Sequence, residues 1–592
     1  MGTNTEFDTD VVIVGSGPMG ATTALALATY GVRAHMVSRF NWLADTPRAH
    51  ITNQRTMEVY RDLQIEEEVL RHATAWDQMG DSLFATSLAG EELIRLRAWG
   101  TGDARHGDYV QGSPCNVVDI IQPEMEPILF KNAAQRGATF STNTEYLSHE
   151  QDESGVTVQL QDRITGREYS MRAKYLVGAD GARSKVVEEL DLKIEGQMAR
   201  AGTAYVIFNA DLTRYVKHRP SILHWIVSPD AAFGEIGLGL LRAVKPWTQW
   251  IAGWGFDISK GEPDLSEETV LSKIRILVGD PDLEVDIVRK SVWYVNQAYA
   301  TTYSKGRVFA GGDATHRHPP SSGLGLNTCV QDGFNLAWKL AYVLKGYAGA
   351  QLLETYSPER APVGKQIVLR ANQSRLDYAP IKAVFSVEGA ENPVAAGIAR
   401  FKDPGPEGAK ARQAAQEALE LKNREFNAQG VEMNQRYNSS AVIPDGQVGE
   451  EEWKRDQELY LQATSRPGAK IPHAWLIDKT GHRVSTLDVT GKGKFTLVTG
   501  LSGGAWVKAA DELDLPFLQT VVTGANDTQD PYCDWQRVRE TSEAGALLVR
   551  PDGYIAWRQG ENVFDAAMAK EFLQSALSAV LGSMKSVAGH AV

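Results

Sequence analysis

The chain has 592 residues, of which 43% are hydrophobic and 23% are charged, and its formal net charge at pH 7 is −13. This composition is typical of a globular protein with several domains, and it excludes wholesale disorder, collagen-like repeats and a coiled coil. The acidic balance, without a stripe of lysine and arginine, argues against a nucleic-acid partner.

The cysteines and the first residues bear on the cellular compartment. Cys115, Cys329 and Cys533 lie far apart and form no CxxC pair, so structural zinc and a disulfide framework are not expected, and a reducing compartment fits. The start, MGTNTEFDTD, lacks the basic and apolar regions of a signal peptide, and no apolar run approaches the roughly 18–20 residues of a spanning helix. We therefore expect a cytoplasmic protein with no metal site and no membrane segment.

The first motif lies within residues 10–38. The apolar run Val11–Val14 predicts a short strand buried on both faces, and an alanine-rich helix and a second strand are predicted to follow it. Gly15, Gly17 and Gly20 stand between strand and helix in GxGxxG spacing. The first glycine permits a tight turn, the second lets a pyrophosphate approach the backbone, and the third lets helix and strand pack closely. The pattern predicts a pyrophosphate site at the N-terminus of this helix.

The end of the second strand lacks the acidic residue that usually binds ribose hydroxyls. The sequence there reads Val37-Ser38-Arg39. Ser38 offers a hydroxyl to the ribose, and Arg39 offers a guanidinium to the adenine or its phosphates.

Two later segments repeat the pattern of a strand followed by a glycine turn. Residues 173–186 place Asp180 at the end of a predicted strand, and residues 306–327 place Asp313 at the end of another. A carboxylate at such a point is suited to accept hydrogen bonds from sugar-type hydroxyls. A glycine-rich turn after Asp313 leads into a predicted helix whose free amides can stabilise negative charge on a ligand.

The motifs GSGPMG, GADGARS and GGDATHRHPP…GLN, in this order and at these separations, resemble the FAD-dependent class A aromatic hydroxylases over nearly the whole chain. PRAHITNQRTME (47–58), LRAVKPWTQW (241–250) and QDGFNLAWKL (331–340) look most like the phenol-hydroxylase branch, which includes 2,4-dichlorophenol 6-monooxygenase and 2-hydroxybiphenyl 3-monooxygenase. The resemblance implies non-covalent FAD, with NADPH or NADH and O2 as co-substrates. One nucleotide-binding unit is evident, which fits transient binding of the nicotinamide nucleotide.

The resemblance also implies roles for individual cofactor-binding residues. Gly15, Gly17, Gly20 and Arg48 would bind the FAD pyrophosphate, and Asp180 would face the pyrophosphate side of the cofactor. Gln122 would contact the ribityl or ribose oxygens, and Asp313 would bind the ribityl hydroxyls. Arg183 would face the region shared with the nicotinamide nucleotide, and Gly325, Leu326 and Asn327 would lie at the N1/O2 edge of the flavin. Pro320 would line one face of the flavin ring, near the substrate.

The candidate catalytic residues are His50 and Arg242. His50 follows two residues after Arg48, and a histidine side chain ordinarily titrates in the range needed for proton transfer. It is therefore either the base or proton relay for a phenol hydroxyl, or a structural histidine. Arg242 orients a phenolate or guides flavin movement, or it forms a solvated salt bridge. His316 is expected to be structural, and His318 is a weaker pocket candidate.

Aromatic residues supply the candidate substrate contacts. Trp99 and Trp225 are the candidates, together with Pro320, and Trp247, Trp250 and Trp254 follow on the same predicted sheet. Because aromatic stripes in sheets are usually core, we expect at most one or two of these tryptophans to touch substrate.

The implied fold is α/β, with a Rossmann-like FAD-binding domain, an inserted, mainly β substrate domain, and a C-terminal thioredoxin-like domain. The expected boundaries are 8–78, 112–200 and 289–375 for the FAD-binding domain, 79–111 and 201–288 for the substrate sheet, 376–439 for a helical linker, and 440–592 for the C-terminal domain. Cys533 stands alone there, so a structural or dimer-forming role is expected instead of redox chemistry. A homodimer or homotetramer is the expected assembly.

Three functions remain open from the sequence. The leading one is a monooxygenase that hydroxylates a substituted phenol ortho to its hydroxyl, through a flavin C4a-hydroperoxide, to give a catechol. The second keeps the chemistry but acts on a polyketide-type or benzoate-type aromatic compound. The third is a flavin-binding protein without monooxygenase activity.

Overall fold

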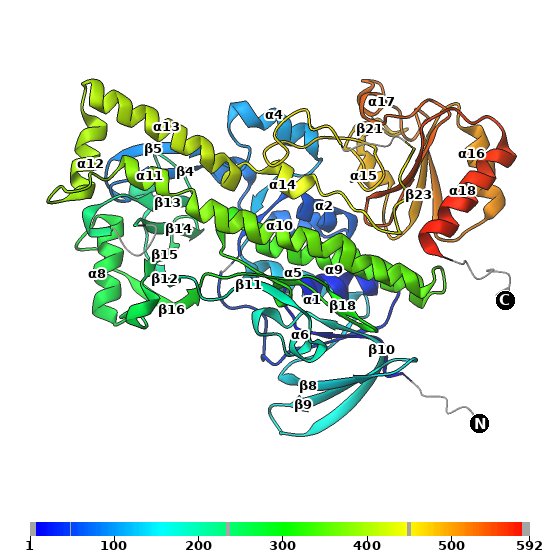
Figure 1. Cartoon of the computed structure of the whole chain (residues 1–592), viewed down its shortest axis with the longest axis horizontal. Coiled ribbons are helices and arrows are strands. Elements are labelled where there is room, and N and C mark those ends of the chain that lie inside the picture. Colours follow the sequence, from blue (N-terminus) through cyan, green and yellow to red (C-terminus); the bar gives the residue numbers. More distant parts are fainter. Residues whose placement is uncertain (1–6, 48, 232–236, 447–450, 583–592) are drawn as a thin grey trace.

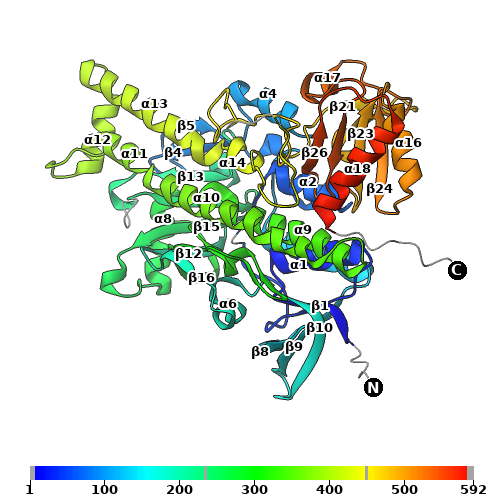
Figure 2. The ribbon, with the colours of Figure 1, turned by 45° about the vertical axis from the view of Figure 1, so that its right-hand side comes forward.

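The computed structural model describes residues 7–47, 49–231, 237–446 and 451–582, which form an α/β molecule (Figure 1). A central domain is flanked by two lobes. One lobe is built on a mainly antiparallel sheet, which we call the roof sheet, and the other is the C-terminal domain, residues 464–582. The two views place these lobes at opposite ends of the central domain (Figure 2). Within the described residues, no helix combines the length and apolar character needed to cross a membrane.

The central domain contains an eight-stranded sheet in the order β18-β19-β10-β1-β2-β7, with β9 and β8 continuing from β10. Its strands are β1 (Thr9–Val14), β2 (Ala34–Val37), β7 (Thr139–Ser141), β8 (Thr144–Gln151), β9 (Val156–Asp162), β10 (Glu168–Gly178), β18 (Ser304–Lys305) and β19 (Val308–Ala310). The strands β19, β10, β1, β2 and β7 run parallel, so their carboxyl ends meet at one edge. Val11, Val12 and Ile13 are fully buried, as the apolar run predicts.

Helices cover this sheet. The helix α1 (Pro18–Thr29) contacts both α5 (Gln122–Gln135) and the long α9 (Leu324–Leu344), which in turn contacts α10 (Tyr356–Leu376). The remaining elements of this part of the chain are α2 (Gln54–Asp62), α3 (Glu66–His72), α4 (Asp103–Gly112), α6 (Lys185–Leu190), β3 (Ile51–Thr52), β6 (Val118–Asp119), β11 (Ile194–Gln197), β17 (Gln297–Ala300) and β20 (His316–Arg317).

The roof sheet joins both predicted insertions. Its order is β16-β12-β15-β14-β13-β4-β5, and β4 pairs with β13 in parallel although about 140 residues separate them. Its strands are β4 (Asp81–Ala85), β5 (Glu92–Arg97), β12 (Gly202–Asn209), β13 (Leu223–Ile226), β14 (Gly239–Lys245), β15 (Gln249–Phe256) and β16 (Asp286–Tyr294). The helices α7 (Thr213–Val216) and α8 (Glu267–Val278) belong to the same lobe, and α8 packs on its outer face.

The segment expected to be a linker packs as core instead. Its helices are α11 (Ala379–Val384), α12 (Pro393–Lys402), α13 (Pro406–Phe426) and α14 (Gln429–Met433). Ala415 and Ala418 of α13 are buried in a cluster with Phe84 of the roof sheet. The side chain of Lys422 has no exposed surface, donates to the Ser374 carbonyl and lies 3.3 Å from the centre of the Tyr378 ring. The helix α13 therefore has a buried face, which the many charged residues in its sequence did not indicate.

The C-terminal domain has a four-stranded sheet in the order β24-β23-β25-β26. The pair β23–β24 is parallel, and β25 and β26 extend it antiparallel, which agrees with the expected thioredoxin-like pattern. Its elements are β21 (Trp475–Ile477), β22 (Arg483–Ser485), α15 (Thr486–Val489), β23 (Phe495–Gly500), α16 (Gly504–Leu513), β24 (Leu518–Thr523), α17 (Asp534–Val538), β25 (Ala546–Val549), β26 (Ile555–Gln559) and α18 (Ala566–Leu581). Cys533 is exposed and unpaired at the start of α17.

A buried cluster of ion pairs fastens the C-terminal domain to the central domain. Arg550 donates to both carboxylate oxygens of Glu359 at 2.7 and 2.8 Å, and Lys339 donates to the same carboxylate at 2.7 Å. Asp552 accepts from Arg550 and from Asn335. The side chains of Arg550, Glu359 and Lys339 have no exposed surface, so each charge depends on its partners for compensation.

Candidate active site

The glycine motif after β1 forms an open cradle. A Cβ atom on Gly15 would lie 2.1 Å from the Ala179 carbonyl oxygen, and the φ of Gly15 is +110°, so this turn requires glycine. A Cβ on Gly20 would lie 2.0 Å from the Gly15 carbonyl oxygen. A Cβ on Gly17 would meet nothing within 4 Å, and α1 begins beside it without a side-chain cap. The space above Gly17 and the free amides of α1 fit an anionic group such as a pyrophosphate.

A small hollow adjoins this cradle. Ser16 donates to the Ser38 hydroxyl at 3.0 Å, and Arg39 is half-buried with its guanidinium 4.9 Å from the centre of the Phe40 ring. The hollow is lined by Ser16, Met36, Ser38, Trp42, Leu43, Phe130, Phe140, Ser141 and Thr142. Its mixture of hydroxyl and aromatic groups suits the adenosine end of a dinucleotide.

Gln122, at the first position of α5, is held by a neighbour. Its Nε2 donates to Glu126 at 2.6 Å, and Glu126 also accepts from the Ala44 amide at 2.7 Å. Glu126 therefore ties the loop before β3 to α5. Arg48, expected to bind the pyrophosphate, is outside the described residues.

The two acidic strand ends differ in how much of the carboxylate is free. Asp180 accepts from the Ser184 hydroxyl and from the amides of Lys185 and Val186, so both of its oxygens cap the start of α6. Asp313, in contrast, is exposed, and its carboxylate accepts only a long contact of 3.8 Å from Cys329 among the described residues. Asp313 is therefore free to accept hydrogen bonds from a ligand. Arg183 is exposed.

The start of α9 lies next to this turn. The helix begins at Leu324, just before the expected Gly325–Asn327, and it also lacks a side-chain cap. Asn327 is buried; its Oδ1 accepts from the Asn53 amide at 3.0 Å, and its Nδ2 donates to the Ile51 carbonyl at 2.9 Å. Leu326 is buried and Pro320 is exposed. The Asn327 side chain therefore fixes the His50 loop against α9.

His50 lies between the central domain and the roof sheet. The pairing of β3 with β6 brings its Nδ1 within 2.7 Å of Oδ2 of Asp119. Burial, and then the nearby Arg242, lower the pKa of His50 to about 4, so the imidazole is neutral near pH 7. No described residue hydrogen-bonds to its Nε2, and the side chain keeps 19% of its surface exposed.

Arg242 reaches from β14 to the same place. Its Nη2 lies 3.5 Å from Oδ1 of Asp119, and its Nη1 donates to the Pro47 carbonyl at 3.3 Å. Burial raises the pKa of Asp119, but His50 and Arg242 outweigh it and hold the pKa below its ordinary value. Burial lowers the pKa of Arg242 to about 10, so it stays protonated near neutral pH. Arg242 is therefore buried, and its ion pair with Asp119 is not a solvated salt bridge.

The inner face of the roof sheet continues from Arg242. One cross-strand row consists of Tyr205, Gly253, Leu240 and Trp225. Tyr205 is only half-buried although β12 is an inner strand, and no described residue hydrogen-bonds to its hydroxyl. Trp225 packs against Phe84 and, at 4.5 Å between ring centres, against Tyr378. This row forms an aromatic wall beside Arg242.

The other tryptophans lie elsewhere. Trp250 and Trp254 face outward into the core under α8, and Trp247 packs partly buried against the same core. Trp99 is buried edge-on against Phe426, and its carbonyl accepts from Trp76. Trp225 is thus the sequence-predicted tryptophan that shares a sheet face with Arg242.

The two histidines of the HRHPP run differ in environment. His316 is fully buried and its Nε2 lies 2.9 Å from Asp332. His318 lies 2.7 Å from the Pro319 carbonyl through Nδ1, and burial, helped by the neighbouring His316, lowers its pKa to about 4. Within the described residues, no group of three His, Cys, Asp or Glu side chains is arranged to hold a metal ion.

Sequence reasoning missed Asp119, Tyr205 and Tyr378. Asp119 follows Val117 and Val118 and is the first residue of DIIQPEME, so its position after a short apolar run was a usable signal. Tyr205 and Tyr378 gave no such signal, because their place depends on strand register and on the packing of the segment beyond residue 376.

Comparisons with known proteins agree with this geometry. Residues 8–371 match the family model of an FAD binding domain, and residues 464–583 match the model "Aromatic-ring hydroxylase, C-terminal". The chain is 47% identical over 582 residues to the 2,4-dichlorophenol 6-monooxygenase of Cupriavidus pinatubonensis, covering 97% of this chain and 96% of that protein. It is 45% identical to the phenol 2-monooxygenase of a Pseudomonas strain, covering 95% and 91%.

A solved structure extends the likeness to three dimensions. The flavin-dependent monooxygenase PieE, in complex with FAD and substrate, superposes with a TM-score of 0.91 at 41% identity, covering 97% of this chain and 100% of that one. The likeness spans all three parts of the molecule.

Proposed function

Because the chain belongs to the FAD-dependent aromatic-ring hydroxylases, we propose that it hydroxylates a substituted phenol ortho to its hydroxyl group. The enzyme is an FAD-dependent aromatic monooxygenase with NAD(P)H as co-substrate. The proposed reaction converts a phenol, O2, NAD(P)H and a proton into a catechol, NAD(P)+ and water.

The residues of the cradle fit FAD. Gly17 leaves open space at the uncapped start of α1, and the Asp313 carboxylate is exposed at the edge where the parallel strands end. When bound, FAD would supply the redox chemistry by which electrons from NAD(P)H reach O2, and one atom of that O2 enters the ring.

One observation carries the substrate assignment: a neutral histidine and a buried arginine share one carboxylate between the central domain and the roof sheet. In the proposed mechanism, Nε2 of His50 accepts the phenol proton, and Asp119 holds Nδ1–H and stabilises the imidazolium that forms. Arg242 stabilises the resulting phenolate oxygen. A phenolate is a stronger carbon nucleophile than a phenol, and its ortho carbon is one of the activated positions.

The aromatic wall has the second role. Tyr205, Leu240 and Trp225 present rings and an aliphatic side chain to the space beside Arg242, so they hold an aromatic substrate and exclude water. A benzoate-type substrate is disfavoured, because its carboxylate would need a cation besides the Arg242 that faces the phenolate oxygen, and the row of Tyr205, Gly253, Leu240 and Trp225 contains none.

A substrate panel tests this proposal. Chlorophenols, alkylphenols, biphenylols, benzoates and a polycyclic phenol are each added to the holoenzyme, and product per NAD(P)H is measured with regiochemistry by NMR. Coupled ortho-hydroxylation of simple phenols is expected. Coupling only with the polycyclic phenol supports a polyketide-type substrate, and NAD(P)H oxidation that no aromatic compound stimulates contradicts monooxygenase activity.

We also propose a homodimer or homotetramer working in the cytoplasm. Met568 and Phe572 of α18, and Phe564 just before this helix, are exposed at four-residue spacing, which favours self-association. The free cysteines fit a reducing compartment. Light scattering of the holoenzyme, with Met568→Glu as the variant, tests the assembly.

A further inference from the structure

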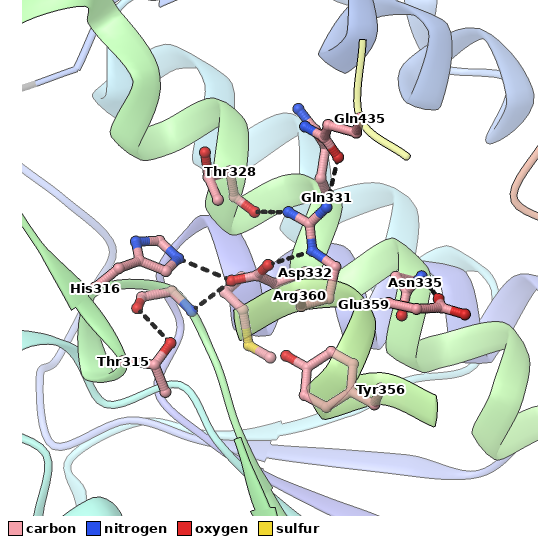
Figure 3. Close-up of polar contacts among 12 residues, drawn as sticks. Thr315, His316, Thr328, Gln331, Asp332, Asn335, Tyr356, Glu359, Arg360 and Gln435 are labelled. Carbon is pink, nitrogen blue, oxygen red and sulfur yellow. Dashed lines mark hydrogen bonds and ion pairs between the residues drawn. The ribbon is translucent and has the colours of Figure 1, made fainter. Parts of the chain in front are cut away.

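The carboxylate of Asp332, on the buried side of α9, lies between His316 and Arg360 (Figure 3). It has no exposed surface and accepts three hydrogen bonds. Its Oδ2 accepts from the Gly312 amide at 3.0 Å and lies 2.9 Å from Nε2 of His316, and its Oδ1 accepts from Nε of Arg360 at 2.7 Å. One side chain thus binds the residues on both sides of Asp313.

The turn itself needs this support. Gly312 has a φ of +64°, and the Thr315 amide donates to its carbonyl at 2.8 Å. The hydroxyl of Tyr356 donates to the Ala310 carbonyl at 3.0 Å. The backbone before and after Asp313 is therefore fixed by groups from α9 and α10, while the Asp313 carboxylate is left free.

Arg360 connects this arrangement to the chain beyond α14. Its Nη1 donates to Gln435 at 2.8 Å (Figure 3) and to the Tyr437 hydroxyl at 3.0 Å. Gln435 donates in turn to Gln331 of α9 at 2.7 Å. The guanidinium compensates the buried Asp332 charge, and the pKa of Asp332 is lowered because Arg360 and His316 together outweigh the effect of burial. Asp332 is therefore ionised and accepts at both oxygens.

We propose that Asp332 is a positioning residue for the cofactor: it holds the Gly311–Asp313 turn in the one conformation in which Asp313 meets the ribityl hydroxyls of FAD. The proposal rests on the assignment of Asp313 in the proposed function. In an Asp332→Asn variant the amide donor takes the place of one oxygen, so either Arg360 or the pair Gly312 and His316 loses its acceptor. The turn then samples other conformations before FAD binds.

The test measures FAD affinity and not turnover. Asp332→Asn apoprotein, titrated with FAD by fluorescence, is expected to show a Kd raised by about 10–100-fold, the effect of losing a hydrogen bond to a charged group. Hydrogen exchange of the amides in 311–318 of the apoprotein should become faster. Asp332→Glu, which keeps the charge, should recover part of the affinity.

Glu359→Gln is the matched control. Glu359 is an equally buried carboxylate on the neighbouring helix, but it pairs with Lys339 and Arg550 and does not contact the turn. Glu359→Gln should lower the urea concentration at the midpoint of unfolding, and it should not change the Kd of the folded protein for FAD. An unchanged Kd in Asp332→Asn, or equal changes in both variants, would overturn the proposal.

The double variant separates this inference from the assignment beneath it. If Asp332 acts through Asp313, then Asp332→Asn adds little to the loss already caused by Asp313→Ala. Additive losses contradict the inference, whereas an unchanged Kd in Asp313→Ala alone contradicts the assignment of Asp313. If Asp332→Asn does not fold, Arg360→Lys replaces it: it keeps the charge, and it should still raise the Kd and the exchange rate.

Discussion

Nδ1 of His50 lies 2.7 Å from Oδ2 of Asp119, whose other oxygen lies 3.5 Å from Arg242. Two basic side chains thus share one buried carboxylate. Because Asp119 occupies Nδ1, the lone pair of the neutral imidazole is at Nε2, and that atom has no partner among the described residues. The arrangement separates the atom that is anchored from the atom that can take a proton.

Replacing His50 by alanine tests this division. FAD should be retained, because Asp313 and the glycine cradle are untouched, while hydroxylation should fall by about 10²–10⁴-fold, the usual contribution of a general base. Product per NAD(P)H should recover partly as the pH approaches the pKa of the phenol. The control is His149→Ala, at a histidine of β8 that pairs with Glu189 of α6. Equal coupling in His50→Ala and wild type would leave His50 a structural residue.

The acid limb of the wild-type pH profile gives a second test. The pKa of His50 is lowered to about 4, so the imidazole remains a competent base from neutral pH down to about pH 5 and is lost only below that. For substrate-saturated holoenzyme, no loss of coupling with an apparent pKa near the ordinary histidine value of about 6.5 is expected. A loss of coupling with an apparent pKa near 6.5 in the wild type, but not in His50→Ala, would contradict the lowered pKa of His50.

Asp313→Ala should weaken FAD binding. Losing a carboxylate that accepts hydrogen bonds from ribityl hydroxyls costs about 1.5–3 kcal/mol, which corresponds to roughly tenfold or more in Kd. Fluorescence titration of the apoprotein measures the change. Asp282→Ala, at an exposed acid beyond α8, should leave the Kd unaltered. A wild-type Kd in Asp313→Ala would show that the cofactor does not depend on this carboxylate.

Trp225→Ala should change which phenols are accepted. Its ring lies in the same row as Tyr205 and packs against Tyr378, so its removal enlarges the wall beside Arg242. The ratio of kcat/KM for a bulky phenol to that for phenol should rise by about 10-fold or more. Trp250→Ala, on the opposite face of the sheet, should lower stability and leave this ratio unchanged. The same shift in both variants would mean that Trp225 acts only through folding.

Arg550→Met should destabilise the whole protein, because it leaves the buried Glu359 with only Lys339 as counter-ion. Breaking such a pair costs about 3–5 kcal/mol, measurable by urea unfolding. The charges on Arg550 and Lys339 outweigh burial and hold the pKa of Glu359 well below its ordinary value. The stabilisation is therefore present above about pH 4.3 and is lost as the pH falls below it. Arg550→Met together with Glu359→Gln should be less acid-sensitive than wild type; equal sensitivity would exclude this pair as the cause.

Features set by neighbouring residues were predictable from the sequence. The strand at Val11–Val14 and the glycine turn after it depend on residues within one short unit, and both lie where the motif predicts them. The fold class, FAD and the aromatic hydroxylase family followed from three motifs in a fixed order, and the comparisons confirm them. The packed state of α13 was missed because its exposed charges dominate its composition.

Features set by register and by distant contacts were not predictable. Trp225 and Trp250 look alike in sequence, but strand alternation and pairing send one toward the central domain and the other under α8. Asp119 meets His50 across 69 positions through a two-residue bridge of strands. Asp180 and Asp313 follow similar motifs, yet only the structure reveals that Ser184 and two amides occupy Asp180.

The buried contact of Arg550 with Glu359 and Lys339 also bears on how this protein can evolve or be recombined. A C-terminal domain taken from a relative brings its own residue to position 550. If that residue is not a matching cation, the buried Glu359 of the recipient loses one of its counter-ions. Viable chimaeras with a crossover between 376 and 464 should therefore be those in which positions 339, 359, 550 and 552 are inherited as a compatible set. Despite its separate sheet, the C-terminal domain is not an interchangeable module, and its sequence is constrained by two helices of the central domain.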